Sequence, residues 1–288
     1  MPTLDEVCAR ALSLPCSPAL LPRLITLLER PDADIEDLAR LIQLDPVLAS
    51  ATVRMANSVF FSGGAKVGTV ADAVMRLGAR ELYRLAALSL ASRWMSIEVE
   101  GYRWEAGDFC RASLVKAVAA EALAMRTRRV DPALAYTCGL VHEIGKLAVA
   151  FACPEAFAGI RARCTAAGCT WLEAETAELG FNHAAVSARL LAEWKFPEAV
   201  VVVAAFNPPA GTIPDEHRAL AAHLHAADHL AAAFGAGQGE DAFLYTLNQD
   251  LLAEQGLDAE TLDAALPVVL ERAARLLGER LTNGKIVF

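Results

Sequence analysis

The sequence has no excess of positive charge, no long apolar run and few aromatic residues. Its 26 Lys and Arg residues are outnumbered by 35 Asp and Glu residues, and the formal net charge is −9. Binding to a phosphate backbone needs clustered basic residues, so this balance argues against nucleic acid as a partner. The longest apolar run, Ala199 to Phe206, is far shorter than the roughly 18–20 residues of a membrane span, so no membrane association is expected.

The seven cysteines are scattered, and no two have the C-x-x-C spacing of a zinc knuckle or redox motif. Their odd number argues against a disulfide framework and favours a reducing compartment. The N-terminal segment MPTLDEVCAR lacks the basic start and apolar run of a signal peptide. We therefore expect a cytoplasmic protein whose cysteines fill the core as small hydrophobic residues.

Aromatic residues make up 7% of the chain, and β-branched runs are few, which argues against an all-β sandwich or barrel. Alanine, the strongest helix former, accounts for about a fifth of the residues. Apolar residues recur at spacings of three and four, as in Leu20, Leu24 and Leu27. The sequence predicts an all-α fold, in which only Val200–Val203 resembles a strand.

Helix-start signals divide the chain into segments. Asp34 and Thr69 are predicted N-caps, and each of the pairs Asp45-Pro46 and Asp131-Pro132 is predicted to open a helix. The helix that begins at Asp131-Pro132 is expected to continue without a break to about Cys153.

The polar stretch 96–108 contains two glycines and is interpreted as a boundary between two helical bundles. We expect an N-terminal bundle over 1–100, packed on a C-terminal helical part over 101–235. Residues 236–288 form a helical extension of the same domain, which either packs back on the bundle or makes a homodimer contact.

The most informative segment is GLVHEIGKLAVAF, where His142 and Glu143 lie among apolar residues. Buried polar side chains need partners, so this pair needs an explanation. One interpretation is metal binding, because imidazole nitrogen and carboxylate oxygen can both bind one ion. The structural alternative pairs Glu143 with Lys146 and places His142 in a hydrogen bond within the core.

A second candidate lies nearer the C-terminus, where His225, Asp228 and His229 share one helix face. They could bind an ion, although this spacing also arises by chance. Around Asn57, the sequence more simply indicates a helix end whose amide satisfies loop backbone groups.

Several segments together resemble the HDOD domain, a branch of the HD superfamily of metal phosphohydrolases. HEIGK at 142–146 resembles the HDIGK signature of that superfamily, with Glu143 in place of aspartate. The resemblance covers about residues 12–235, and its segments follow the family order: LPRLITLLERPDADIEDLARLIQLDPVLASATVRMANSVFFS at 21–62, TVADAVMRLGARELYRLAA at 69–87, TCGLVHEIGKL at 137–147, GFNHAAVSARLLAEWKFPEAVVVVAAFNPP at 180–209 and LAAHLHAADHLA at 220–231.

The resemblance also implies which metal ligands of catalytic relatives are kept. The first histidine of those relatives is replaced by Ala112, and a later histidine pair reads Phe206-Asn207. The vestigial positions that remain are His142, Glu143, His183 and Asp228. Glutamate is one methylene longer than aspartate, so it displaces its oxygens from ligand distance unless the helix shifts.

These substitutions lead us to expect no bound metal, no cofactor and no catalysis. HDOD domains resemble degenerate HD folds used in bacterial signalling, so the resemblance implies a regulatory module with a protein partner. Two alternatives stay open: a residual HD phosphohydrolase or phosphodiesterase that uses the four vestigial residues, and a sensor of a nucleotide or another small ligand.

Overall fold

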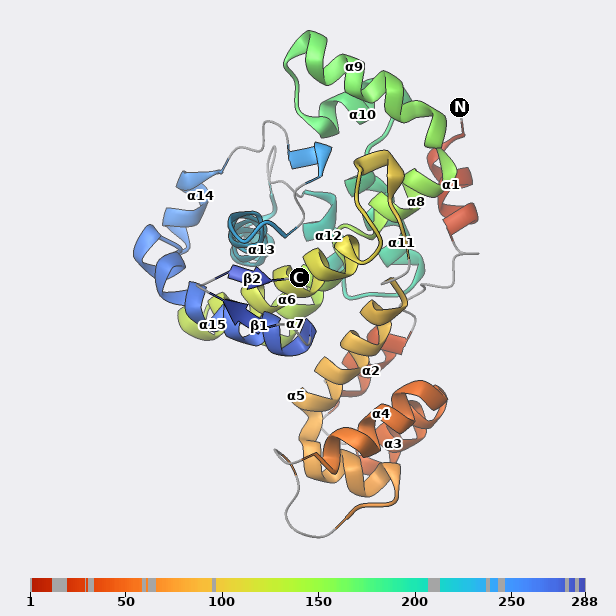
Figure 1. Ribbon diagram of the computed structural model, residues 1–288, viewed down its shortest axis with the longest axis vertical. Helices are drawn as coiled ribbons and strands as arrows, with labels where there is room; N and C mark the ends of the chain where they lie inside the picture. Colours follow the sequence, from red (N-terminus) through yellow and green to blue (C-terminus); the bar gives the residue numbers. More distant parts are fainter. Residues whose placement is uncertain are drawn as a thin grey trace. The chain divides into compact units, whose positions relative to one another are not determined.

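The computed structural model describes residues 2–11, 20–28, 30, 34–58, 61, 66–94, 97–206, 213–236, 239–242, 247–277, 280–282 and 285–287. Within these residues the secondary structure is helical, apart from a short hairpin near the C-terminus (Figure 1). The hairpin pairs β1 (Arg280–Thr282) with β2 (Lys285–Val287) in antiparallel register. The predicted all-α class is confirmed, and Val200–Val203 is helical rather than extended.

The chain divides into two compact units, of which the smaller is Cys16–Arg93. Its helices are α2 (Leu20–Leu28), α3 (Ile35–Gln43), α4 (Pro46–Ala56) and α5 (Val70–Ala91). The predicted caps are present, because Asp34 and Thr69 each accept the backbone N–H three residues ahead. Asn57 bonds both the N–H and the carbonyl of Val67, at 3.0 and 2.9 Å, and so closes the loop after α4.

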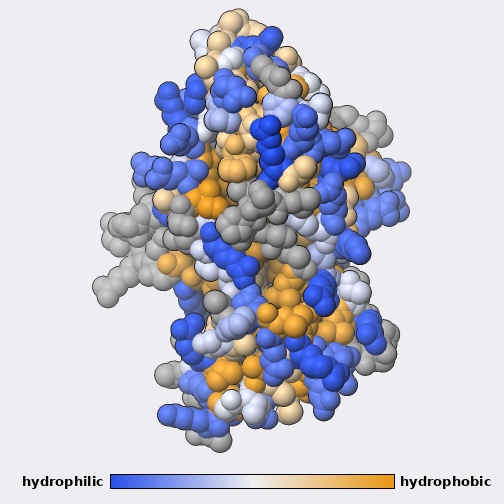
Figure 2. All heavy atoms as spheres, turned by 90° about the vertical axis from the view of Figure 1, so that its right-hand side faces the viewer, coloured by the Kyte–Doolittle hydropathy of each residue, from blue (hydrophilic) through white to orange (hydrophobic). Residues whose placement is uncertain are grey.

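Gly78 interrupts α5 with a positive φ of 74°, so two helical segments meet there at a kink. Because a side chain is strained in this backbone region, glycine suits the position. Apolar side chains gather over Cys16–Arg93 on the face that Figure 2 shows.

The larger unit joins residues 1–15 to residues 94–288. Its helices are α1 (Leu4–Ala11), α6 (Asp108–Thr127), α7 (Pro132–Val141), α8 (Ile144–Ala152), α9 (Phe157–Ala167), α10 (Trp171–Leu179), α11 (His183–Glu193), α12 (Glu198–Ala205), α13 (Asp215–Ala233), α14 (Gln249–Glu254) and α15 (Ala259–Leu277). Short 3₁₀ turns add η1 (Ser92–Trp94), η2 (Glu100–Tyr102), η3 (Pro154–Ala156) and η4 (Glu240–Ala242). The predicted N-terminal bundle over 1–100 includes residues 1–15, whereas the structure groups them with the larger unit.

Helix α6 is the centre of the larger unit. Every residue from Phe109 to Ala124 except Arg111 is buried, and the helix packs against α7, α13 and α15. Such a helix shows little amphipathic pattern, because all of its faces meet protein. The helices of 236–288 therefore pack back on this unit, and Arg272 of α15 lies 3.3 Å from Glu121 of α6.

The prediction of one helix from Asp131-Pro132 to Cys153 is wrong, because the chain breaks at His142 and Glu143 between α7 and α8. The N–H of Gly145 donates to Ser187 Oγ at 2.9 Å instead of continuing the helical ladder. A Cβ on Gly145 would lie 2.0 Å from the carbonyl oxygen of His183. Close contact with α11 therefore shapes the turn and requires glycine.

One stretch of the described residues, Pro132–Ala152, has the length and mean hydropathy, 1.2, of a membrane span. However, 83% of its apolar window is buried inside the protein, as expected for a core segment.

Replacing Gly145 by alanine is expected to destabilise the larger unit by about 2–3 kcal/mol, because the new methyl group overlaps the α11 backbone. Urea unfolding of Gly145→Ala against the wild-type protein measures this loss. The matched control is Gly68→Ala, since a Cβ at Gly68 has no heavy atom within 4 Å. A Gly145→Ala protein as stable as the control would contradict the role of this contact.

Candidate functional site

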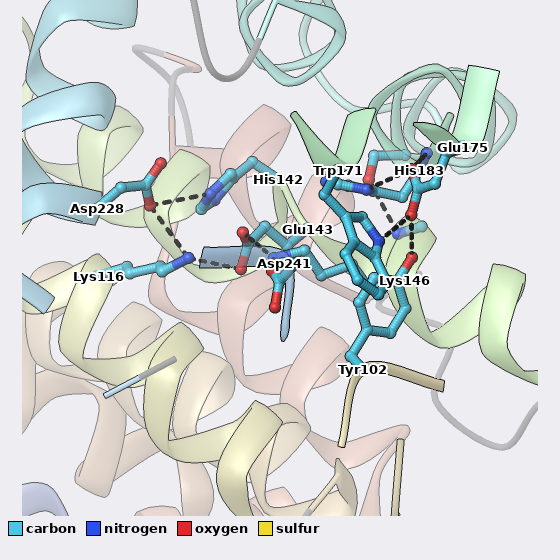
Figure 3. Close-up of polar contacts among 12 residues, drawn as sticks. Tyr102, Lys116, His142, Glu143, Lys146, Trp171, Glu175, His183, Asp228 and Asp241 are labelled. Carbon is cyan, nitrogen blue, oxygen red and sulfur yellow. Dashed lines mark hydrogen bonds and ion pairs between the residues drawn. The ribbon is translucent and has the colours of Figure 1, made fainter. Parts of the chain in front are cut away.

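Three of the four vestigial HD residues lie at the junction of α7 and α8 and on α13, within the larger unit (Figure 3). His142 and Glu143 form the turn between α7 and α8, and Asp228 lies on α13. All three are buried, with at most 9% of their surface exposed. The structure therefore brings three of the four predicted positions together in the core.

Lys116 of α6 lies between the two carboxylates of this cluster. Its Nζ is 2.6 Å from Glu143 Oε2 and 3.2 Å from Asp228 Oδ1. Lys116 follows Ala112 by one helical turn, and helical side chains lean toward the N-terminus of their helix. The ammonium thus reaches the face of α6 on which the resemblance places the missing histidine.

A second lysine continues the network. Lys146 of α8 contacts Glu143 and lies 2.6 Å from Asp241 Oδ2 of η4. Its side chain is 3% exposed, and its ammonium also lies 5.0 Å from the centre of the Trp104 ring. Each buried cation therefore has two carboxylate partners, which offsets the cost of removing the charges from water.

His142 is hydrogen-bonded on one side of its ring and lies close to a carboxylate on the other. Its Nδ1 lies 2.9 Å from the carbonyl oxygen of Cys138, and its Nε2 lies 3.2 Å from Asp228 Oδ1. Both contacts of the structural alternative are present: Glu143 pairs with Lys146, and His142 is bonded within the core.

The lysines control the ionisation of the carboxylates. Burial raises the pKa of Glu143, but Lys116 and Lys146 outweigh it and hold the pKa well below its ordinary value. The pKa of Asp228 is likewise lowered against burial, by Lys116 and His142. Burial lowers the pKa of Lys146, but Asp241 and Glu143 raise it above its ordinary value. The cluster is therefore a set of buried ion pairs at neutral pH.

His183 belongs to a separate cluster around Glu175 (Figure 3). The Glu175 side chain, with no exposed surface, accepts hydrogen bonds from Tyr102 Oη at 2.6 Å and Trp171 Nε1 at 2.9 Å. It also accepts from the His183 backbone N–H, and lies 2.8 Å from His183 Nδ1. The fourth predicted position thus joins a satisfied structural network rather than the His142 cluster.

The residues present do not fit the metal site of catalytic HD proteins. Ala112 and Phe206 offer no ligand atoms, Lys116 lies between the two carboxylates, and Asn207 is outside the described residues. Among the residues that the structure describes, no three His, Cys, Asp or Glu side chains form a group able to hold an ion. His225 does not join Asp228 in such a group, because its Nε2 accepts the N–H of Asn248 at 2.9 Å.

Five of the cysteines are buried and free: Cys8, Cys110, Cys138, Cys153 and Cys164. Burial raises the pKa of Cys8 to about 11 and that of Cys110 to about 12. These thiols are therefore protonated at neutral pH, which confirms their predicted role as core residues.

Lys116, Glu175 and Asp241 are the site residues that the sequence analysis missed. A lysine four residues after Ala112 in an otherwise apolar helix is itself a signal, because a buried lysine needs a carboxylate partner. Asp241 offers no comparable signal, since it is more than 90 residues from Lys146 in the chain.

Lys116→Met should destabilise the protein at pH 7 by about 3–5 kcal/mol, because it leaves two buried carboxylates without their shared cation. The wild-type carboxylates have lowered pKa values, so their contribution is present above their unfolded pKa values of 4.5 and 3.8 and is lost as pH falls. In the variant the folded-state pKa values rise, so protonation relieves the repulsion. The stability gap from wild type should narrow as pH falls from 7 to about 5.

Urea unfolding at several pH values measures this gap. Arg272→Met is the control, because it removes the partly exposed cation of another ion pair on α6. A gap for Lys116→Met that stays constant with pH would contradict the predicted coupling.

Comparison with known proteins identifies relatives of this fold. The family model of the HDOD domain matches residues 14–208. A proposed signal transduction protein from Marinobacter aquaeolei VT8 is 27% identical with a TM-score of 0.70, over 96% of this chain and 60% of that chain. An HDOD domain protein from Geobacter sulfurreducens is 21% identical with a TM-score of 0.67, over 95% and 97% of the two chains.

A proposed phosphohydrolase from Shewanella amazonensis SB2B is 25% identical with a TM-score of 0.62, over 94% of both chains. An uncharacterized protein of Treponema pallidum (strain Nichols) is 25% identical over 222 residues, or 72% of this chain. The match covers 40% of that relative's length. The family match spans more than half of the sequence, and the chain therefore belongs to the HDOD domain family.

Proposed function

We propose that this chain is a regulatory HDOD module that acts by binding another protein and has no catalytic activity of its own. The observation that carries the proposal is the position of Lys116, whose ammonium contacts both Glu143 and Asp228. These are the carboxylates that the HD resemblance assigns to a metal ion.

Metal-assisted hydrolysis requires a fixed ion with an open position for water and oriented surrounding ligands. In this chain the ammonium of Lys116 already forms ion pairs with both carboxylates. A divalent ion at the same oxygens would meet the Lys116 ammonium at short range in a buried, low-dielectric setting, where repulsion is strong. Ala112 and Phe206 add no ligand atom to offset that repulsion.

The helical scaffold, by contrast, is retained. The family match covers 14–208. The described parts of the motifs between 137 and 231, which include the vestigial HD residues, all lie in the larger unit. A retained scaffold whose site carboxylates are already paired with a lysine favours a role in recognition over a role in chemistry. The resemblance to a proposed signal transduction protein supports the regulatory role, while the proposed phosphohydrolase among the similar structures names the activity to be tested.

The purified protein is expected to show no turnover of bis-p-nitrophenyl phosphate, nucleotides or cyclic dinucleotides with added magnesium, manganese, iron or zinc. Product formation, followed by absorbance and by chromatography, measures this directly. Asp228→Ala is the matched control, because an HD-type activity depends on this carboxylate while a contaminating enzyme does not. Turnover in the wild-type protein that disappears in Asp228→Ala would overturn the proposal.

A further inference from the structure

The 3₁₀ turn η4 places two adjacent carboxylates on three cations. Asp241 Oδ2 lies 2.6 Å from Lys146 Nζ, a contact that Figure 3 shows. Glu240 contacts Arg161 through Oε2 and lies 2.9 Å from Arg103 Nε through Oε1. This short segment is therefore bound through its charges, as a ligand would be.

The cations come from three separate elements that hold them in place. Arg103 and Trp104 lie on a turn closed by an antiparallel bridge between Val99 and Trp104. Arg103 has a positive φ of 55° because it is the left-handed C-cap that ends η2. Arg161 of α9 also donates to the carbonyl of Gly101 at 3.3 Å, which ties α9 to that turn. These three cations beside Trp104, namely Arg103, Lys146 and Arg161, define the cationic pocket, in which Lys146 and Arg161 also have partners outside η4.

The residue that precedes the two acidic residues in the pocket has to be glycine. A Cβ on Gly239 would lie 1.8 Å from Trp104 Nε1, so only glycine fits against the indole. Trp104 Nε1 and Asp241 Oδ1 are buried without a hydrogen-bond partner in the described part of the chain. The indole N–H therefore lacks an acceptor and the carboxylate oxygen lacks a donor. Because unpaired buried polar atoms cost free energy, the built-in segment does not satisfy the pocket fully.

The segment η4 makes ion pairs through its side chains with Arg103, Lys146 and Arg161. Its contacts with Arg103 and Arg161 are partly exposed, since Arg103 is 70% exposed, and exposed ion pairs are weak and screened by salt. Glycines at 235, 237 and 239 raise the entropic cost of ordering the segment. Release of η4 breaks these exposed pairs at little cost, but it also breaks the buried pair of Lys146 and Asp241, so an incoming segment must supply a carboxylate to Lys146 in its place.

We propose that the cationic pocket is a recognition site for an acidic peptide segment of a partner protein, and that Gly239–Asp241 occupies it as a built-in competitor. This inference rests on the proposed function and specifies the chemistry of its partner. A partner segment with glycine before two acidic residues displaces η4 and takes over its contacts.

A peptide fits this site better than a single phosphate does. The cations serve two different carboxylates: Lys146 binds Asp241, whereas Arg103 and Arg161 bind Glu240. A single phosphate offers one centre of charge, and it leaves the glycine position beside Trp104 empty. Two acids on adjacent residues, preceded by a bare backbone, match all of these features.

The test uses a fluorescent peptide with the sequence of residues 236–242, AGQGEDA, and measures its binding by anisotropy. A tethered segment competes at a high effective concentration, so the wild-type protein should bind the peptide weakly. The double variant Glu240→Gln/Asp241→Asn releases the built-in competitor and should bind the peptide at least about tenfold more tightly. The peptide AGQGQNA should not bind either protein, and added Arg161→Met should weaken binding to the double variant.

Gly239→Ala provides a second route to the open site, because its methyl group displaces η4 from Trp104 without a change of charge. It should also bind the peptide more tightly than the wild-type protein does. Equal binding by all proteins would overturn the role of η4, and no binding by either variant would overturn the recognition site. Inorganic phosphate that raises the melting temperature of the double variant when the peptide does not bind would assign a phosphate site instead. Every preparation is also assayed for phosphoester hydrolysis, because turnover would refute the proposed function and leave the peptide result to judge this inference.

Discussion

The ammonium of Lys116, held between Glu143 and Asp228, is the interaction on which the candidate site depends. A buried charge is tolerated only when it is paired, and this one links α6 to the turn between α7 and α8 and to α13. Removing either kind of partner leaves an uncompensated charge in the core. The lysine therefore explains both why the acidic residues of an HD-type site persist here and why they take part in structure.

The break between α7 and α8 makes this arrangement possible. The N–H of Gly145 bonds Ser187, and its missing side chain lets α11 approach, so the chain turns at His142 and Glu143. The turn presents Glu143 to both lysines. In the same unit, Lys146 extends the network to η4, so the neutralised site and the cationic pocket share one residue.

Local signals in the sequence predict most of the fold. The caps at Asp34 and Thr69 depend on residues three positions apart, and the resemblance to the HDOD family supplies the order of the helices. The break at His142 escaped prediction because it depends on α11, far along the chain. The contact of Asp241 with Lys146 and that of His183 with Glu175 were not predicted for the same reason. Tertiary contacts decide which buried polar groups pair, and such contacts produce no periodic pattern in the sequence.

The most direct test of the account is the metal content of the purified protein. The protein is prepared without chelator and incubated in turn with manganese, iron and zinc, and the metal per chain is then measured by elemental analysis. Because the Lys116 ammonium is already paired with both Glu143 and Asp228, the account predicts well below one equivalent of each metal. One equivalent of a retained metal that is lost in His142→Ala would contradict it.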